Sequence, residues 1–306
     1  MTSRLWQFAA AAIAAASLGV LAGCAGPSAM AATVRHADVN GARLAYVEQG
    51  EGPPVVLVHG SVADHRTWDR HRAALAQHYR VIAYSQRYFG TEPWSPRWPK
   101  IGVPVQSDDL AAFIRSMNAG PVHLVGWSSG GTVAINVALQ HPELVKSAFV
   151  YEPSLVSIVI DSVDRKAIAD DRSAAFGPAL QAVRAGDNTA ALRLVLDAVD
   201  ARSGALEGWP PAVQAVAIDN ARTLPLEFLD SDPAPQITCA QLGQLKPVVA
   251  IARGERTRSS YRLMADEAAR CVGGNRHVVI SNGRHLWPAD EPLAFSAEVL
   301  RFLKQQ

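Results

Sequence analysis

The chain has 306 residues, of which 49% are hydrophobic and 19% are charged, a composition typical of a globular protein with a full core. The formal net charge is +1 at pH 7 and no run of lysine or arginine stands out, which argues against nucleic acid as a partner. The nine histidines are scattered and no Cys/His cluster has zinc-ligand spacing, so we expect no metal site.

The first segment of the chain is typical of a targeting sequence. One basic residue, Arg4, precedes an apolar run of small residues, which predicts a secretory signal peptide over residues 1–23. The run is too short and too rich in alanine to favour a transmembrane helix.

The end of this segment, LAGC at residues 21–24, resembles the lipobox of bacterial lipoproteins, in which the cysteine is lipidated and becomes the mature N-terminus. The resemblance implies a membrane anchor at Cys24 and a tether over residues 24–39. Ala25 is not the aspartate that favours inner-membrane retention, so we expect a place in the bacterial cell envelope at the outer membrane. A secreted protein without the lipid is the alternative.

Short apolar runs alternate with helical patterns along the next part of the chain. Strands are predicted for the runs at 42–50, 53–60, 79–85, 121–127 and 146–152. Helical patterns lie between them at 68–77, 106–119 and 130–141, and the segment 106–119 is expected to carry its acidic residues in the first turn. This rhythm predicts an α/β fold, with a mostly parallel sheet covered by helices on both faces.

The rhythm stops after residue 153 and returns near residue 240. Helical segments and proline-containing turns fill the interval, without a strong strand pattern. Further strands are then predicted at 246–254 and 276–281, and further helices at 259–271 and 292–305. The sequence therefore predicts a core over 40–153 and 240–306, interrupted by a helical cap over 154–239.

The stretch GWSSG at residues 126–130 fits the pattern G-x-S-x-G between a predicted strand and a predicted helix. A serine at such a turn is held in a strained backbone, and glycines two residues away on each side remove collisions with the neighbouring elements. Only Ser128 has glycine at both places, so it is the predicted nucleophile. The backbone N–H of Ser129 would then face a developing oxyanion, and Trp127 would line the substrate pocket.

A serine hydroxyl needs a base, and a histidine on a loop after a late strand is the expected one. His285 follows the predicted strand 276–281 among turn residues. His123 and His277 lie inside strands and are expected to be packed, whereas His59 ends a strand and is expected to support a turn.

Taken in order, LVHG, GWSSGG and NGRHLWPADEP resemble the motifs of α/β-hydrolases, and the resemblance covers about residues 40–304. It implies a cap inserted after the sixth strand of the family's sheet and no cofactor. It also implies a second oxyanion donor near Ser61 or Val62, of which we favour Ser61. The stretch YSQRYFG at 84–90 departs from the family's D-x-R-G-x-G loop, since the aspartate and the glycine after Arg87 are replaced.

The acid of the triad is missing from its usual place, where this chain has Thr257. Four carboxylates remain as candidates: Glu152, Glu255, Asp266 and Asp290. Glu152 follows the strand after the G-x-S-x-G helix, at the sheet edge where active sites of such folds gather, and some haloalkane dehalogenases resemble this arrangement. We predict Glu152 as the acid and keep Glu255 as the alternative.

A serine nucleophile argues against the alkyl-enzyme chemistry of dehalogenases and epoxide hydrolases and favours acyl transfer to water. The sequence therefore predicts a Ser-His-Glu hydrolase of a small or medium carboxylic ester, with a small molecule as its partner. Hydrolysis of a C–C or amide bond is an alternative, and so is a non-catalytic ligand-binding lipoprotein. Trp209 and Trp287 could belong to the pocket or to the core.

The remaining cysteines, Cys239 and Cys271, form an even pair in a chain expected to be exported to an oxidising compartment. This favours a disulfide between them. Two unconnected buried thiols are the alternative.

Overall fold

The computed structural model describes residues 33–274 and 276–306. The predicted signal peptide over residues 1–23 and the predicted anchor at Cys24 lie outside these residues. Among the residues described, no helix combines the length and the apolar character that crossing a membrane requires.

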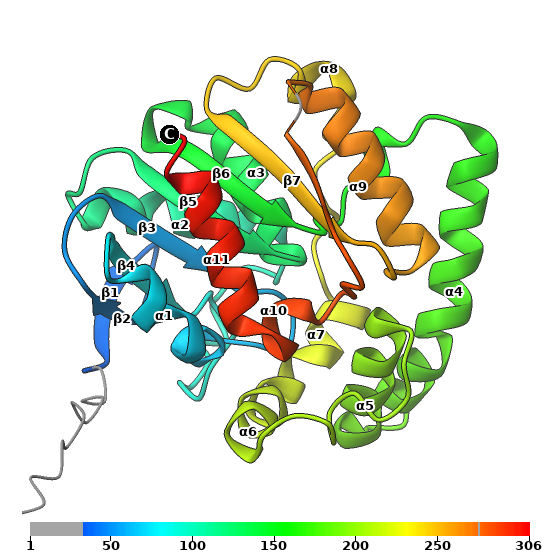
Figure 1. Cartoon of the computed structure of the whole chain (residues 1–306). Helices are drawn as coiled ribbons and strands as arrows, with labels where there is room; N and C mark the ends of the chain where they lie inside the picture. The colour runs from blue at the N-terminus through cyan, green and yellow to red at the C-terminus, as the bar shows by residue number, and fades with distance from the viewer. Residues whose placement is uncertain (1–32, 275) are drawn as a thin grey trace, which may run out of the picture. The chain divides into compact units, whose positions relative to one another are not determined.

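An eight-stranded sheet forms the centre of the described structure (Figure 1). Its strands are β1 (Arg35–Val39), β2 (Ala42–Gln49), β3 (Pro54–Val58), β4 (Arg80–Tyr84), β5 (Val122–Trp127), β6 (Val145–Tyr151), β7 (Val248–Gly254) and β8 (His277–Ile280). They lie in the order β1-β2-β4-β3-β5-β6-β7-β8. The pairs β1–β2 and β2–β4 are antiparallel, and the six strands from β4 to β8 in this order are parallel. The central strands β3 and β5 are rich in apolar residues because both of their faces are buried.

The sheet begins earlier than predicted. Residues 35–39, which were assigned to the tether 24–39, form β1 and pair with β2, with Val39 opposite Ala42. The sequence RHADV has three polar residues and only Val39 is buried, so no apolar run marks this edge strand. The predicted boundary at residue 40 is therefore wrong for residues 35–39.

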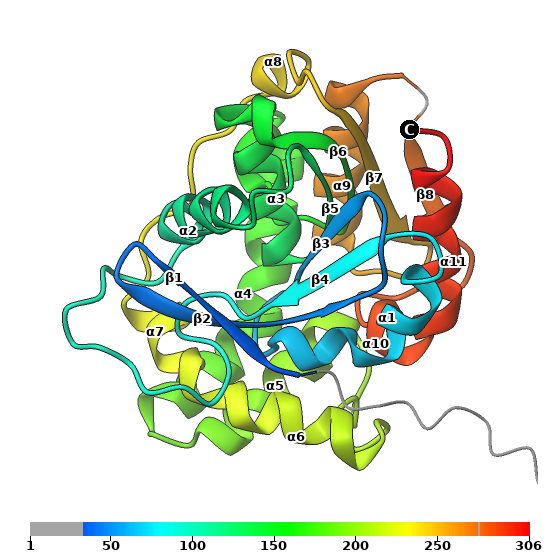
Figure 2. The ribbon, with the colours of Figure 1, turned by 90° about the vertical axis from the view of Figure 1, so that its left-hand side faces the viewer.

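Helices cover both faces of the sheet (Figures 1 and 2). On one face lie α1 (Asp69–Leu75), α10 (Trp287–Asp290) and α11 (Pro292–Leu303). On the other face lie α2 (Val103–Ser116), α3 (Ser129–Gln140) and α9 (Ser259–Val272). Their buried side chains belong to two separate apolar clusters, one with the α1 and α11 residues and one with the α2, α3 and α9 residues. The predicted fold class is confirmed.

Helix α2 differs from its prediction in register. It begins three residues before the predicted segment 106–119, so no acidic residue lies in its first turn, and the expected interaction with the helix dipole is wrong. Asp109 is instead buried and pairs with Arg87, whose Nε and Nη2 each lie 2.7 Å from a carboxylate oxygen. This pair connects the loop after β4 to helix α2. In that loop Tyr88 adopts φ 78°, at the position where the family that the sequence resembles has glycine.

The chain between β6 and β7 is helical. It forms α4 (Ser162–Arg184), α5 (Asn188–Asp200), α6 (Pro211–Asn220) and α7 (Leu224–Leu229), and then the short α8 (Cys239–Leu242). Asn220 connects this segment to the core, since its side chain donates to the buried Asp64 at 2.7 Å and accepts from the Gly90 N–H at 2.6 Å. Helices α4 to α7 form the cap, and their side chains line the cavities at Ser128.

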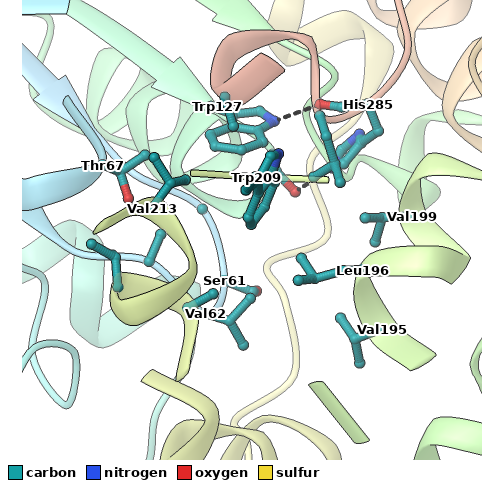
Figure 3. Close-up of a pocket in the computed structure, with 17 residues that line it drawn as sticks. Ser61, Val62, Thr67, Trp127, Val195, Leu196, Val199, Trp209, Val213 and His285 are labelled. Atoms are coloured by element: carbon teal, nitrogen blue, oxygen red, sulfur yellow. Dashed lines mark hydrogen bonds between the residues drawn. The ribbon is translucent and has the colours of Figure 1, made fainter. Parts of the chain in front are cut away.

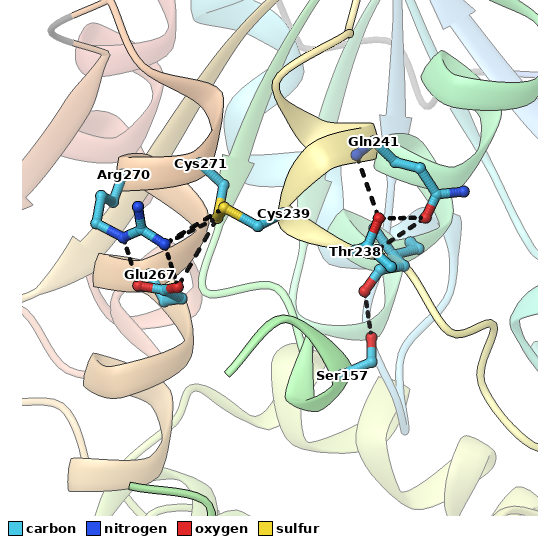
Figure 4. The surroundings of a disulfide bond; sticks show 8 residues. Ser157, Thr238, Cys239, Gln241, Glu267, Arg270 and Cys271 are labelled. Carbon is cyan, nitrogen blue, oxygen red and sulfur yellow. Dashed lines mark hydrogen bonds and ion pairs between the residues drawn. A yellow bond between two sulfur atoms is a disulfide. The ribbon is translucent and has the colours of Figure 1, made fainter. Parts of the chain in front are cut away.

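Cys239, the first residue of α8, and Cys271, near the end of α9, are joined by a disulfide (Figure 4). Arg270 lies beside it and donates from Nη2 to the Cys239 sulfur at 3.4 Å, and the same side chain pairs with Glu267. The bond attaches the chain that returns from the cap to helix α9.

Candidate active site

Ser128 occupies a sharp turn between β5 and α3. Its backbone has φ 55° and ψ −126°, a conformation that residues other than glycine rarely adopt. A Cβ atom on Gly126 would lie 2.7 Å from the Gly130 carbonyl oxygen, and one on Gly130 would lie 2.3 Å from the His59 carbonyl oxygen. Both positions therefore require glycine, which is the steric reason for the register seen in the sequence.

His285 lies after β8, in the loop that leads into α10, and its side chain is buried. Its Nε2 lies 3.1 Å from Ser128 Oγ. The ring stacks on Tyr261 of α9, with centroids 4.1 Å apart and planes inclined by 14°. Trp127 Nε1 donates to the His285 carbonyl oxygen at 3.0 Å (Figure 3), so contacts from β5 and α9 both fix this histidine.

Glu152 follows β6 and is fully buried. Its Oε2 lies 2.6 Å from His285 Nδ1. The carboxylate also accepts from the Gly254 N–H at 2.7 Å and from the Thr257 hydroxyl at 2.8 Å. Thr257, at the position where the family that the sequence resembles has its acid, thus donates to Glu152.

The other carboxylates considered from the sequence have different partners. Glu255 is exposed and accepts from the Asn282 N–H at 2.9 Å. Asp266 pairs with Arg253 and His277, and Asp290 accepts from Trp209 Nε1 at 2.8 Å. Of the four candidates, only Glu152 contacts His285 in the described structure.

The other histidines that the sequence brought into consideration have partners other than Ser128. His59 is fully buried beside the turn at Ser128, and its Nε2 accepts from the Gln86 N–H at 3.0 Å. Burial lowers the pKa of His59 to about 4, so the ring is neutral at pH 7. His123 is buried, as expected, and its Nδ1 lies 2.7 Å from Ser147 Oγ between two strands. His277 lies 3.2 Å from Asp266 but is exposed, because β8 is the edge strand of the sheet, so the expectation that it is packed is wrong.

Two backbone segments meet next to Ser128 Oγ. Ser129 is the first residue of α3, so its N–H belongs to the donors that a helix leaves unpaired at its start. Ser61 follows β3, and its hydroxyl lies 3.5 Å from that of Ser129. The next residue, Val62, has φ 49°, an unusual value for a β-branched side chain.

Two cavities adjoin Ser128. The narrower one, of about 50 Å³, is mostly apolar and extends past Trp127 and His285 to Trp209 of the cap (Figure 3). The larger one, of about 500 Å³, lies under α4, α5 and α7. Trp127 therefore lines a pocket as predicted from its position. Trp209 also belongs to the pocket, whereas Trp287 packs against Tyr151 and Phe295 in the core.

Two residues near His285 were not found by sequence reasoning. In the sequence, Tyr261 is one aromatic residue in an amphipathic helix and Asp200 is the last residue of a cap helix. Neither lies in a motif that indicates a place near the candidate triad. In the structure Asp200 Oδ1 accepts from the Leu286 N–H at 3.0 Å, next to His285 in the chain. Burial raises the pKa of Asp200, against the lowering effect of that hydrogen bond.

Comparison with known proteins gives a consistent picture. A family model described as alpha/beta hydrolase fold matches residues 53–189. An esterase from Thermogutta terrifontis has a similar structure, with a TM-score of 0.68 and 19% identity over 90% of this chain and 99% of that one.

Two curated proteins are similar over part of their sequence. The 2-hydroxy-6-oxo-6-(2'-aminophenyl)hexa-2,4-dienoic acid hydrolase of Metapseudomonas resinovorans is 35% identical over 37% of this chain and 40% of its own length. The pimeloyl-[acyl-carrier protein] methyl ester esterase of Aeromonas hydrophila is 36% identical over 32% of this chain and 37% of its own length. The matched region thus spans less than half of either relative.

Proposed function

The chain has the α/β-hydrolase fold, and we propose that it is a cofactor-independent serine hydrolase that cleaves a small or medium carboxylic ester. The observation that carries the proposal is the continuous path from Ser128 Oγ through His285 to Glu152, with distances of 3.1 and 2.6 Å. The similarity of the chain to esterases supports the same reaction class.

In the proposed acylation step, His285 Nε2 accepts the Ser128 proton while Oγ attacks the ester carbonyl carbon. Glu152 accepts a hydrogen bond from His285 Nδ1–H, which fixes the reactive tautomer and stabilises the imidazolium. The C–O bond to the alcohol then breaks, and His285 returns the proton to the leaving oxygen. An acyl-enzyme ester on Ser128 remains.

In the proposed deacylation step, His285 takes a proton from water, whose oxygen attacks the acyl carbon. The bond to Ser128 Oγ breaks, the serine recovers its proton, and the carboxylic acid leaves. The N–H groups of Ser129 and Ser61 hold the oxyanion in both steps, and the loss of one such donor typically costs a factor of about 10²–10³ in rate.

Hydrolysis of a panel of aliphatic and aryl esters tests the proposal. We expect turnover by the full-length chain and its loss in Ser128→Ala and His285→Ala, with unchanged circular dichroism. A folded wild-type protein that cleaves none of the esters would contradict the proposal. A C–C substrate is a useful addition to the panel, because hydrolysis of a C–C bond is the alternative reaction for the same serine and histidine.

We also propose that the enzyme is anchored by a lipid on Cys24 in the bacterial cell envelope, at the outer membrane. The support is the LAGC stretch at the end of a signal-like segment. Metabolic labelling with a palmitate analogue should mark the wild type and spare Cys24→Ser. Equal labelling of both would contradict the anchor.

A further inference from the structure

The two cavities at Ser128 differ in size and in chemistry. The narrower cavity is bounded largely by aliphatic and aromatic side chains, among them Val62, Trp209 and Leu286. The larger cavity also contains polar groups from three cap and core helices, including Arg172, Glu227 and Tyr261. A substrate that fills both therefore has one small apolar part and one longer part with a polar group.

The position of His285 indicates which part of an ester enters which cavity. His285 lines the narrow cavity, whereas Ser128 is the only member of the proposed triad that lines the large one among the described residues. The leaving oxygen must lie near His285 to receive its proton. The alcohol part therefore extends into the narrow cavity, where only a small apolar group fits, and the acyl part extends into the large one.

Arg172 of α4 is the one basic side chain that lines the large cavity in the described structure. It is half-buried, and its guanidinium lies 5.5 Å from the centre of the Phe176 ring. No ion pair or hydrogen bond joins it to another described residue. The nearby Arg258, in contrast, pairs with Asp171 at 2.8 Å. A guanidinium held over a ring and facing a cavity without a partner is suited to bind an anion.

The acidic group of the large cavity is engaged elsewhere. Thr223 Oγ1 donates to Glu227 Oε1 at 2.6 Å. Burial raises the pKa of Glu227, and hydrogen bonds from Ser61 and Thr223 lower it in part. Glu227 and Arg172 form no ion pair with one another, so the positive charge of Arg172 remains available to a ligand.

We propose that the preferred substrates are half-esters of dicarboxylic acids with a small alcohol, whose free carboxylate pairs with Arg172. The acyl carbon lies at Ser128, the small alkoxy group enters the narrow cavity, and the chain between the two carboxyl groups spans the large cavity. This inference rests on the proposed esterase function and adds the substrate class to it.

The test compares two matched substrate series on the full-length chain. One series is the monomethyl esters of dicarboxylic acids with four to eight carbons, and the other has the free carboxylate replaced by a neutral primary amide. We expect kcat/KM for the best carboxylate to exceed that of its amide by at least about 10-fold. In Arg172→Met this ratio should fall by roughly 10- to 100-fold, the range typical of a hydrogen-bonded charge pair.

Arg165→Met is the matched control, because Arg165 lies on the same helix, is exposed and does not line the cavity. It should leave the ratio unchanged, and Arg172→Lys should keep part of it. Two results would overturn this inference while leaving the esterase proposal intact. One is that the methyl esters of the amide series are cleaved as fast as those of the carboxylate series, or faster. The other is that the carboxylate-to-amide ratio of kcat/KM is unchanged in Arg172→Met. Failure to cleave either series, with no reactive Ser128, would overturn both.

Discussion

At the level of single residues, three positions with an unusual backbone conformation lie where the chemistry is proposed. Ser128, Val62 and Glu152 all have positive φ values, of 55°, 49° and 48°, and none of them is glycine. Each such residue costs of the order of 1–3 kcal/mol and persists only where its surroundings fix it. The backbone of Glu152 is held by a hydrogen bond from its N–H to the Ala252 carbonyl oxygen at 2.8 Å.

Replacement of Glu152 by glutamine should separate its role from that of a buried structural acid. The amide keeps the size but places an N–H₂ or a neutral oxygen against His285, which disturbs the tautomer needed to accept the serine proton. By comparison with the same change in a serine protease triad, we expect kcat to fall on the order of 10³- to 10⁴-fold. Steady-state kinetics on a cleavable ester measures it.

Glu255→Gln is the matched control, since Glu255 is exposed and contacts Asn282 rather than His285. It should retain full activity. If Glu152→Gln remained as active as the wild type, or if Glu255→Gln lost activity instead, the assignment of the acid would be wrong.

At the level of helices and strands, the sequence predicts best those elements in which nearly all side chains are buried. The strand β3 is apolar throughout and every residue of β5 is buried, and the helix after Ser128 starts within one residue of its prediction. The edge strand β1 and the four-residue α10 were missed because neither has a repeated apolar pattern. The turn residues around Ser128 could be predicted because sterics require glycine there.

Local sequence patterns do not predict contacts between elements that are distant in the chain. The stacking of Tyr261 on His285 depends on how α9 packs, and no spacing in the sequence encodes it. The contact of Asp200 at the end of α5 with the histidine loop has the same origin. The sequence therefore predicted the candidate triad, which lies at the ends of recognisable strands, but not the residues that hold it in place.

Asp200 should act as a positioning residue through the Leu286 N–H. In Asp200→Ala that buried donor loses its acceptor, and we expect kcat to fall about 10-fold with little change in KM. Asp200→Asn keeps an oxygen that can accept the same bond and should restore most of kcat. A loss of kcat in the asparagine variant equal to that in the alanine variant would contradict this role.

At the scale of the whole molecule, the buried histidines couple folding to pH. Burial lowers the pKa of His59, His71 and His123 to about 4 in each case. Their pKa in the unfolded chain is about 6.5. The unfolded state therefore binds more protons than the folded state between these values, and stability is lost as pH falls through this window.

His71 gives a direct test, because its Nε2 lies 2.9 Å from the Pro288 carbonyl oxygen and the ring is buried against α11. The contribution of His71 to the unfolding free energy should be fully present above pH 6.5. About 3 kcal/mol should be lost by pH 4, because protonation of this one group favours the unfolded state. Denaturant unfolding of the wild type and His71→Gln from pH 8 to 4 measures it. The variant should lose less over this range, and parallel curves would contradict the assignment.

If Ser128 is an activated nucleophile, it should react with a fluorophosphonate probe. The full-length chain is treated with the probe, and the labelled peptide is mapped by mass spectrometry. We expect label on Ser128 that is lost in His285→Ala. A folded wild-type protein without label on Ser128, or equal labelling of Ser128 in His285→Ala, would contradict it.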